Sequence, residues 1–135
     1  MVLVMGYSKY YNVKTRASDG NVFDSGKEAR RWEQLLLLQR AGKVTNLDRQ
    51  VEYELIPAQY ETYPRFSKKG ERLKDGQRLL ERKVAYVADF TYLDAESGEL
   101  IVEDVKGCKQ GAAYELFTIK RKLMLAVHSI RVREI

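Results

Sequence analysis

Residues 83–106 of the chain, KVAYVADFTYLDAESGELIVEDVK, decide its fold. Residues 83–93 and 99–106 are rich in β-branched and aromatic side chains, which is typical of strands. Between them, residues 94–98 (DAESG) have the composition of a tight turn. The stretch therefore predicts an antiparallel hairpin of two strands.

The register of this hairpin decides which side chains share a face. If the loop has four residues, Asp94 faces Glu99, and continuing the pairing along both strands places Asp89 opposite Asp104. Lys106 follows Asp104 by two residues and therefore lies on the same face. A shift of one residue would move these groups to the other face. The rest of the predicted face is mostly apolar: Ala85, Val87, Thr91, Leu93, Leu100 and Val102.

The two carboxylates and the amine allow two interpretations. Carboxylate oxygens, together with a backbone carbonyl, can bind a hard divalent cation, and a lysine beside them can position a water molecule. The alternative is a structural ion pair at the edge of the sheet, between Lys106 and either Asp89 or Asp104. These residues alone leave both interpretations open.

Helices and further strands are predicted on either side of the hairpin. Ser25 and Glu28 have the spacing of a capping box, and Gly42 can close the helix that follows. The order of elements predicts an α/β layer sandwich around a small mixed sheet. Outside the hairpin, the predicted elements are a helix at 26–41, a strand at 50–56, a helix at 112–127 and a strand at 129–134.

Length and composition restrict the class of protein. A chain of 135 residues with 44% apolar residues suits one compact domain, here 1–135. Cys108 and His128 are the single cysteine and histidine, which excludes an internal disulfide, a zinc cluster built on paired cysteines and a histidine-rich metal site. A bound metal would therefore have oxygen ligands, as Mg²⁺ or Mn²⁺ prefers.

The sequence gives no indication of membrane insertion. The first eleven residues lack a basic segment followed by an apolar run, so we expect no signal peptide. No stretch approaches the ~18 consecutive apolar residues of a spanning helix. We therefore expect a cytoplasmic protein.

Positive charge is concentrated in two segments. Residues 62–83 contain eight basic and three acidic residues, so this segment alone has a charge of +5, equal to the net charge of the whole chain. The second basic segment, near the start of the chain, contains Lys9, Lys14 and Arg16. We interpret 58–82 as a long loop or a hairpin that binds nucleic acid, although a solvated lysine-rich loop is the alternative. Aromatic residues in or beside it can stack on bases or fill a gap in the core: Tyr60, Tyr63 and Phe66. Its candidate DNA contacts are Arg65, Lys68, Lys69, Arg72 and Lys74.

The order of these residues resembles a known family. Ala88-Asp89, followed after the turn by residues 103–107 (EDVKG), is similar to the PD-(D/E)xK nuclease signature, with Ala88 in place of the nominal proline. More closely, the chain resembles a phage-encoded family of that superfamily, long catalogued as a domain of unknown function. The resemblance covers nearly the whole chain and includes 23–31, 53–57 and the last helix.

The resemblance implies a restriction-endonuclease-like core and a role for each site residue. Asp89, Asp104 and Glu28 would ligate Mg²⁺ or Mn²⁺, and Lys106 would lie beside the attacking water or the scissile phosphate. Glu28 has a structural alternative, because it also occupies the third position of the capping box.

Lysines of the last helix complete the candidate site. Lys120 is the one charged residue in an apolar stripe of that helix, so it either reaches the active site, as the resemblance implies, or extends to the surface. Lys122 points elsewhere and is a candidate contact to the DNA backbone.

The function implied is a Mg²⁺-dependent DNA endonuclease that leaves a 5′-phosphate. We expect a structure-specific enzyme, similar to a Holliday junction resolvase, which would act as a homodimer in phage DNA replication or recombination in the host cytoplasm. The alternatives are a less selective nuclease or nickase and a non-catalytic DNA-binding module of the same fold.

Overall fold

The structure, a computed structural model, describes residues 3–7 and 13–135. None of the helices in this part of the chain combines the length and apolar character that a membrane span requires. The elements in chain order are β1 (Leu3–Tyr7), β2 (Val13–Arg16), β3 (Val22–Phe23), α1 (Gly26–Arg40), β4 (Val44–Ile56), β5 (Gln59–Phe66), β6 (Arg72–Glu81), β7 (Val84–Asp94), β8 (Leu100–Asp104), α2 (Ala112–His128) and β9 (Arg133–Glu134).

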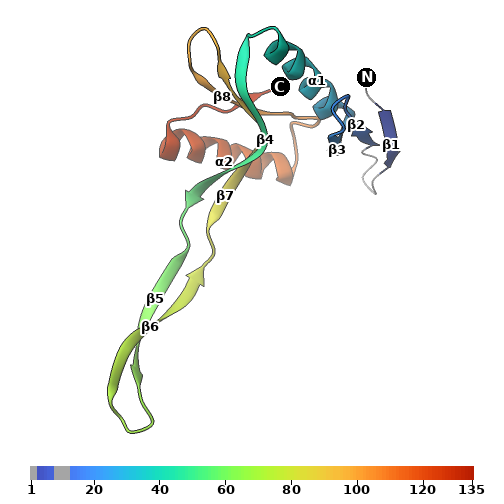
Figure 1. Cartoon of the computed structure of the whole chain (residues 1–135). Helices are drawn as coiled ribbons and strands as arrows, with labels where there is room; N and C mark the ends of the chain where they lie inside the picture. Colours follow the sequence, from blue (N-terminus) through green and yellow to red (C-terminus); the bar gives the residue numbers. More distant parts are fainter. Residues whose placement is uncertain (1–2, 8–12) are drawn as a thin grey trace.

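A mixed sheet forms the centre of the molecule, in the strand order β4-β7-β8-β9 (Figure 1). Neighbouring strands are antiparallel except for β8 and β9, which are parallel. The predicted hairpin is confirmed as β7 and β8. Its register is also confirmed, because Phe90 pairs with Glu103 and Leu93 pairs with Leu100. The described part of the chain is therefore α/β, with a mixed sheet and two helices.

The two helices pack against opposite faces of this sheet. Successive residues of β8 point to opposite sides, so Ile101 packs with α1 and Val102 packs with α2. We call the two groups of buried residues the α1 cluster and the α2 cluster. The α1 cluster comprises Ala17, Phe23, Ala29, Trp32, Leu35, Val44, Phe90, Tyr92, Ile101 and Val105. The α2 cluster comprises Leu55, Tyr86, Ala88, Val102, Phe117, Met124 and Val132.

Gln50 of β4 adopts a left-handed backbone conformation with φ of 55°. The pairs Arg49–Phe90 and Val51–Ala88 flank it, so Gln50 lies across from Asp89. On the two sides of Asp89, the buried side chains of β7 face different cores. Ala88 belongs to the α2 cluster, whereas Phe90 belongs to the α1 cluster. Asp89 therefore lies where the two cores meet.

Residues 58–82, predicted as a loop or a hairpin, form the antiparallel hairpin β5–β6, which we call the arm. Figure 1 shows it projecting from the body as a continuation of β4 and β7. Tyr63 packs over Gly76, where an added Cβ would lie 2.3 Å from the ring. Tyr60 and Phe66 are 58% and 60% exposed, so they do not fill the core.

Three parts of the described chain differ from the predictions. The sheet β1-β2-β3 was not predicted, because its strands are too short to show a period. Strand β4 begins at Val44 rather than at residue 50, since positive φ values at Asn46 and Gln50 break the alternation. The last strand has two residues rather than six, because Ser129, with φ of 57°, ends α2 and a loop follows.

Candidate active site

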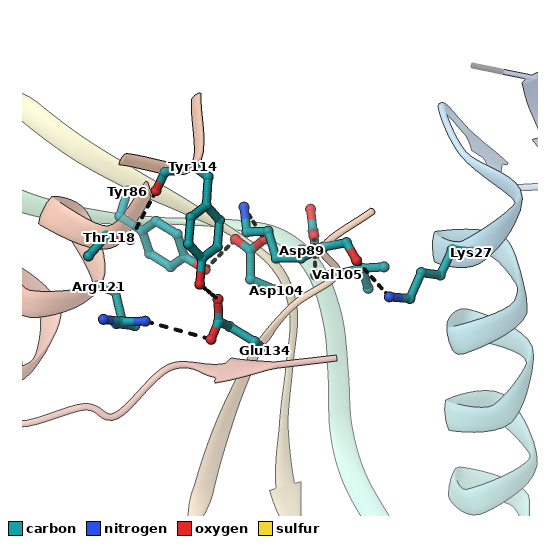
Figure 2. A network of polar contacts seen from close by, with 10 residues as sticks. Lys27, Tyr86, Asp89, Asp104, Val105, Tyr114, Thr118, Arg121 and Glu134 are labelled. Atoms are coloured by element: carbon teal, nitrogen blue, oxygen red, sulfur yellow. Dashed lines mark hydrogen bonds and ion pairs between the residues drawn. The ribbon is translucent and has the colours of Figure 1, made fainter. Parts of the chain in front are cut away.

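Two of the predicted acids, Asp89 and Asp104, lie close together between β7 and β8 (Figure 2), and Lys106 contacts Asp104. Asp89 Oδ2 accepts a hydrogen bond of 2.8 Å from the backbone N–H of Val105. Lys106 Nζ lies 2.7 Å from Asp104 Oδ1, while the Tyr86 hydroxyl donates to Asp104 Oδ2 at 2.7 Å. The structure thus brings Asp89, Asp104 and Lys106 together, as the register predicted.

Lys106 is fixed from two further directions. Its ammonium group lies 3.7 Å from the ring centroid of Phe117 in α2. Its backbone carbonyl accepts a hydrogen bond of 2.6 Å from Lys27 Nζ in the first turn of α1. Both helices therefore hold the lysine at the end of β8.

Glu28 lies in the first turn of α1, where its backbone and its carboxylate have different surroundings. Its backbone N–H donates to Ser25 Oγ at 3.2 Å, which confirms Ser25 as the N-cap. Among the described residues its carboxylate makes no hydrogen bond or ion pair, so the reciprocal half of the capping box is absent. Burial, followed by the charges of Asp89 and Asp24, raises the pKa of Glu28 to about 7. The carboxylate therefore lies within range of the charges of Asp89 and Asp104.

Asp89 experiences the same accumulation of negative charge. Burial and the nearby charge of Asp104 raise its pKa to about 6, although the hydrogen bond from Val105 and the charges of Lys106 and Arg49 oppose this rise. Carboxylates that repel one another in a partly buried site are stabilised by a cation.

The donor set fits a hard divalent cation in its chemistry, because Asp89, Asp104 and Glu28 offer only oxygen atoms. The described residues include no group of three acidic, histidine or cysteine side chains already gathered as a metal site. Both oxygens of Asp104 are also occupied, by Lys106 and by Tyr86. Each oxygen keeps a second lone pair, so Mg²⁺ or Mn²⁺ would share the Asp104 carboxylate with Lys106 and Tyr86 or replace one of them.

A shallow pocket of about 260 Å³ gives access to Asp104 and Lys106 from solvent. Lys120 of α2 lines the same pocket, together with Tyr86 and Leu116. Lys122 is exposed and lines a different depression, between α2 and the last residues of the chain. Of the two alternatives left open for Lys120, the structure therefore favours the position beside the candidate site, whereas Lys122 lies away from it.

Glu103 faces away from its neighbour Asp104, because successive residues of a strand point to opposite sides. It is 1% exposed and accepts hydrogen bonds from Arg31 Nε and Nη2 at 2.8 and 2.5 Å, and one from the Tyr92 hydroxyl. This buried ion pair fixes β8 to α1 and leaves Glu103 no part in the candidate site.

Sequence reasoning missed Tyr86, Lys27 and Arg49. Alternation places Tyr86 on the face opposite to Asp104, and the change of cluster beside Asp89 brings it into contact. Lys27 directly precedes Glu28, and this position was the one feature of the sequence that could have indicated its place beside the site. Arg49 lies 4.1 Å above the Phe23 ring and lowers the pKa of both Asp89 and Glu28. No pattern in the strand singled it out.

The predicted DNA contacts lie outside the acidic site. Lys14 and Arg16 are exposed on β2, and Lys9 lies outside the described residues. Lys69 lies in the turn of the arm, where Gly70 has φ of 81°. The arm residues are all exposed: Arg65, Lys68, Lys69, Arg72 and Lys74.

Comparison with known proteins identifies one family. No curated protein and no solved structure matches the chain. Residues 7–133 match the family described as "Protein of unknown function (DUF1064)". Because this match covers almost the whole chain, the protein belongs to the DUF1064 family.

Proposed function

We propose that the protein is a metal-dependent nuclease that hydrolyses phosphodiester bonds in DNA, on a restriction-endonuclease-like core. The observation that carries the proposal is the meeting of Asp89 and Asp104 beside Lys106, with Glu28 near enough for their charges to raise its pKa. Raised pKa values at Glu28 and Asp89 indicate excess negative charge in a partly buried site, and such sites are often functional.

Each residue of the site has a distinct role in this proposal. Asp89 and Asp104 would hold Mg²⁺ or Mn²⁺, with Glu28 as the third acid. The bound ion would supply positive charge to the phosphate and lower the pKa of a nearby water. Lys106 and Lys120 add positive charge at the mouth of the pocket, where a phosphate would lie.

The arm would grip the DNA in this proposal. Its exposed arginine and lysine side chains can neutralise backbone phosphates, a contact that does not depend on sequence. Exposed Tyr60 and Phe66 can stack on unpaired bases. Such stacking favours DNA with single-stranded or branched regions, and a four-way junction is the first substrate to test.

A cleavage panel tests the proposal. Purified protein would be incubated with Mg²⁺ or Mn²⁺ and duplex, single-stranded, flap and four-way junction DNA. We expect cleavage of at least one substrate that leaves a 5′-phosphate and is abolished by EDTA. Asp89→Asn and Lys106→Met should each lower the rate at least ~100-fold, because the first removes a carboxylate that would hold the metal ion and the second removes a positive charge beside the phosphate. Full activity in both variants would refute the assignment of the site.

The second candidate is a DNA-binding module without catalysis. The observation that favours it is the closed contact of Asp104 with Lys106 and Tyr86, which occupies both carboxylate oxygens. Binding of DNA by wild-type protein, with no cleavage of any substrate in either metal, would establish this alternative.

A further inference from the structure

The outer face of α2 carries an apolar stripe. The helix packs against the sheet through Phe117 and Met124, which are both buried. Beside this buried face and extending around to the outer side, spacings of four, three, four and three residues separate Ala112, Leu116, Ile119, Leu123 and Ala126. This spacing is that of the contact positions in a two-stranded coiled coil, extended here over two heptads.

Much of this stripe is open to solvent. Leu116 is 53% and Ile119 is 56% exposed, and Ala112 and Ala126 are also exposed. Leu123 is half-buried, because it also packs against the α2 cluster. A continuous row of exposed apolar side chains on a helix is typical of a face that another helix covers.

The stripe is complementary to itself when two copies of α2 run antiparallel. A twofold axis near Ile119 would place Leu116 against Leu123 of the second copy, and Ala112 against Ala126 of the second copy. The same axis would bring Glu115 next to Lys122 of the second copy. These two exposed residues lie one heptad apart on one flank of the stripe. Large residues meet near the centre, small ones at the ends, and opposite charges at the rim.

We infer that this stripe of α2 is the interface of a homodimer, in which two copies of the helix pack antiparallel. The symmetry of the pattern selects a second copy of this chain as the partner, since an isologous interface must match itself. A polyanion is a poor occupant, because the centre of the stripe carries no charge. The inference rests on the helix alone and does not require the nuclease proposal.

The dimer has a consequence for the candidate site. Leu116 and Lys120 line the pocket that contains Asp104 and Lys106, so each pocket would lie along one edge of the shared seam. Two such sites related by a twofold axis suit a substrate that itself has twofold symmetry.

Analytical ultracentrifugation of the full chain over a range of concentrations tests the interface. We expect wild-type protein to dimerise and Ile119→Glu to weaken the dimer about a hundredfold, because two charges would be buried at the axis. Leu80→Glu, at an exposed apolar position of the arm, is the matched control and should leave the dimer intact. Circular dichroism would establish that both variants remain folded.

Charge reversal tests the antiparallel pairing directly. Glu115→Lys and Lys122→Glu should each weaken the dimer about tenfold, because like charges then meet twice. An equimolar mixture of these two variants should form heterodimers with wild-type affinity, since every pair is again of opposite charge. A wild-type monomer at all concentrations would overturn the inference. A dimer broken by Leu80→Glu but not by Ile119→Glu would also overturn it, as would failure of the mixture to associate.

Discussion

The candidate site contains acids in different environments. Asp104 has an ammonium group and a hydroxyl as partners, whereas Asp89 has one backbone N–H and Glu28 has no partner for its carboxylate among the described residues. Burial and mutual repulsion therefore act most strongly on Glu28, whose pKa rises to about 7. Such a group weakens the fold whenever it is ionised, and function is a sufficient reason for its presence.

The pH dependence of stability provides a test at Glu28. The folded protein retains this proton up to about pH 7, whereas the unfolded chain loses it near the ordinary value of 4.5. The folded state therefore binds more protons in this interval, and its stability falls as the pH rises from about 4.5 to 7. We expect Glu28→Gln to stabilise the fold by about 1–2 kcal/mol at pH 8 and to have no effect at pH 4.

Urea denaturation at both pH values measures this difference. Glu96→Gln, at an exposed turn position, is the control and should change stability at neither pH. A Glu28→Gln variant that is less stable than wild type at pH 8 would mean that the carboxylate makes a stabilising contact.

The adjacent acids Glu103 and Asp104 should differ in role: Glu103 should contribute mainly to stability and Asp104 mainly to cleavage. Glu103→Gln leaves Arg31 without its buried partner and should destabilise the fold by about 3 kcal/mol, yet the folded variant should still cleave DNA. Asp104→Asn should destabilise the fold by about 1 kcal/mol. Under the nuclease proposal it should also lower the cleavage rate at least ~100-fold. Thermal unfolding would measure the stability of both variants, and a cleavage assay at low temperature would measure their activity. If Asp104→Asn lost more stability and Glu103→Gln lost more activity, the two assignments would be reversed.

At the scale of elements, the sequence predicted what regular alternation can reveal. Period-two patterns and turn residues predicted β7 and β8, and the turn length alone was enough to bring Asp89 near Asp104. The left-handed conformation of Gln50 leaves no trace in the pattern. The change of cluster that brings Tyr86 to Asp104 was therefore not predictable, and neither were the short strands β1 to β3.

The arm is the element least connected to the rest. Its strands pair with each other and continue away from the sheet, so its side chains stabilise the body little (Figure 1). A lone two-stranded hairpin is marginally stable in water. Stacking of Arg78 over Tyr63, at 4.9 Å, and an ion pair with Glu61 supply part of its order. Substitutions at its exposed end should therefore change binding without changing the fold.

The double variant Lys68→Gln/Lys69→Gln tests the arm as a DNA grip. If both lysines contact phosphates, the slope of log K against log salt should become shallower by about 1–2. The free energy of unfolding should stay within about 0.5 kcal/mol of wild type. Fluorescence anisotropy with duplex DNA at several salt concentrations gives the slope. The control is Arg40→Gln/Lys43→Gln, which removes two positive charges near the end of α1, away from the arm. If this control changed the slope equally, the lysines of the arm would contribute only to the general attraction between a basic protein and DNA.

At the scale of the whole molecule, the candidate site joins elements that are distant in sequence. Glu28 comes from α1, Asp89 from β7, Asp104 from β8, and Lys120 lines the pocket from α2. Without a bound cation the acids repel one another, and this repulsion lowers the stability of the folded body. A ligand that removes the repulsion would stabilise all of these elements at once, whereas the arm would be unaffected.

Thermal unfolding with divalent cations tests this coupling. If Mn²⁺ binds through Asp89 and Asp104, a concentration ten times its Kd should stabilise the fold by about 1.4 kcal/mol and raise Tm by about 3–5 °C. The rise should be larger at pH 8 than at pH 5.5, because Glu28 and Asp89, with pKa values of about 7 and about 6, must lose protons to bind the ion. EDTA should reverse it, and Asp89→Asn/Asp104→Asn should abolish it. An equal rise in that double variant would place the bound cation elsewhere, and the acids would then be structural.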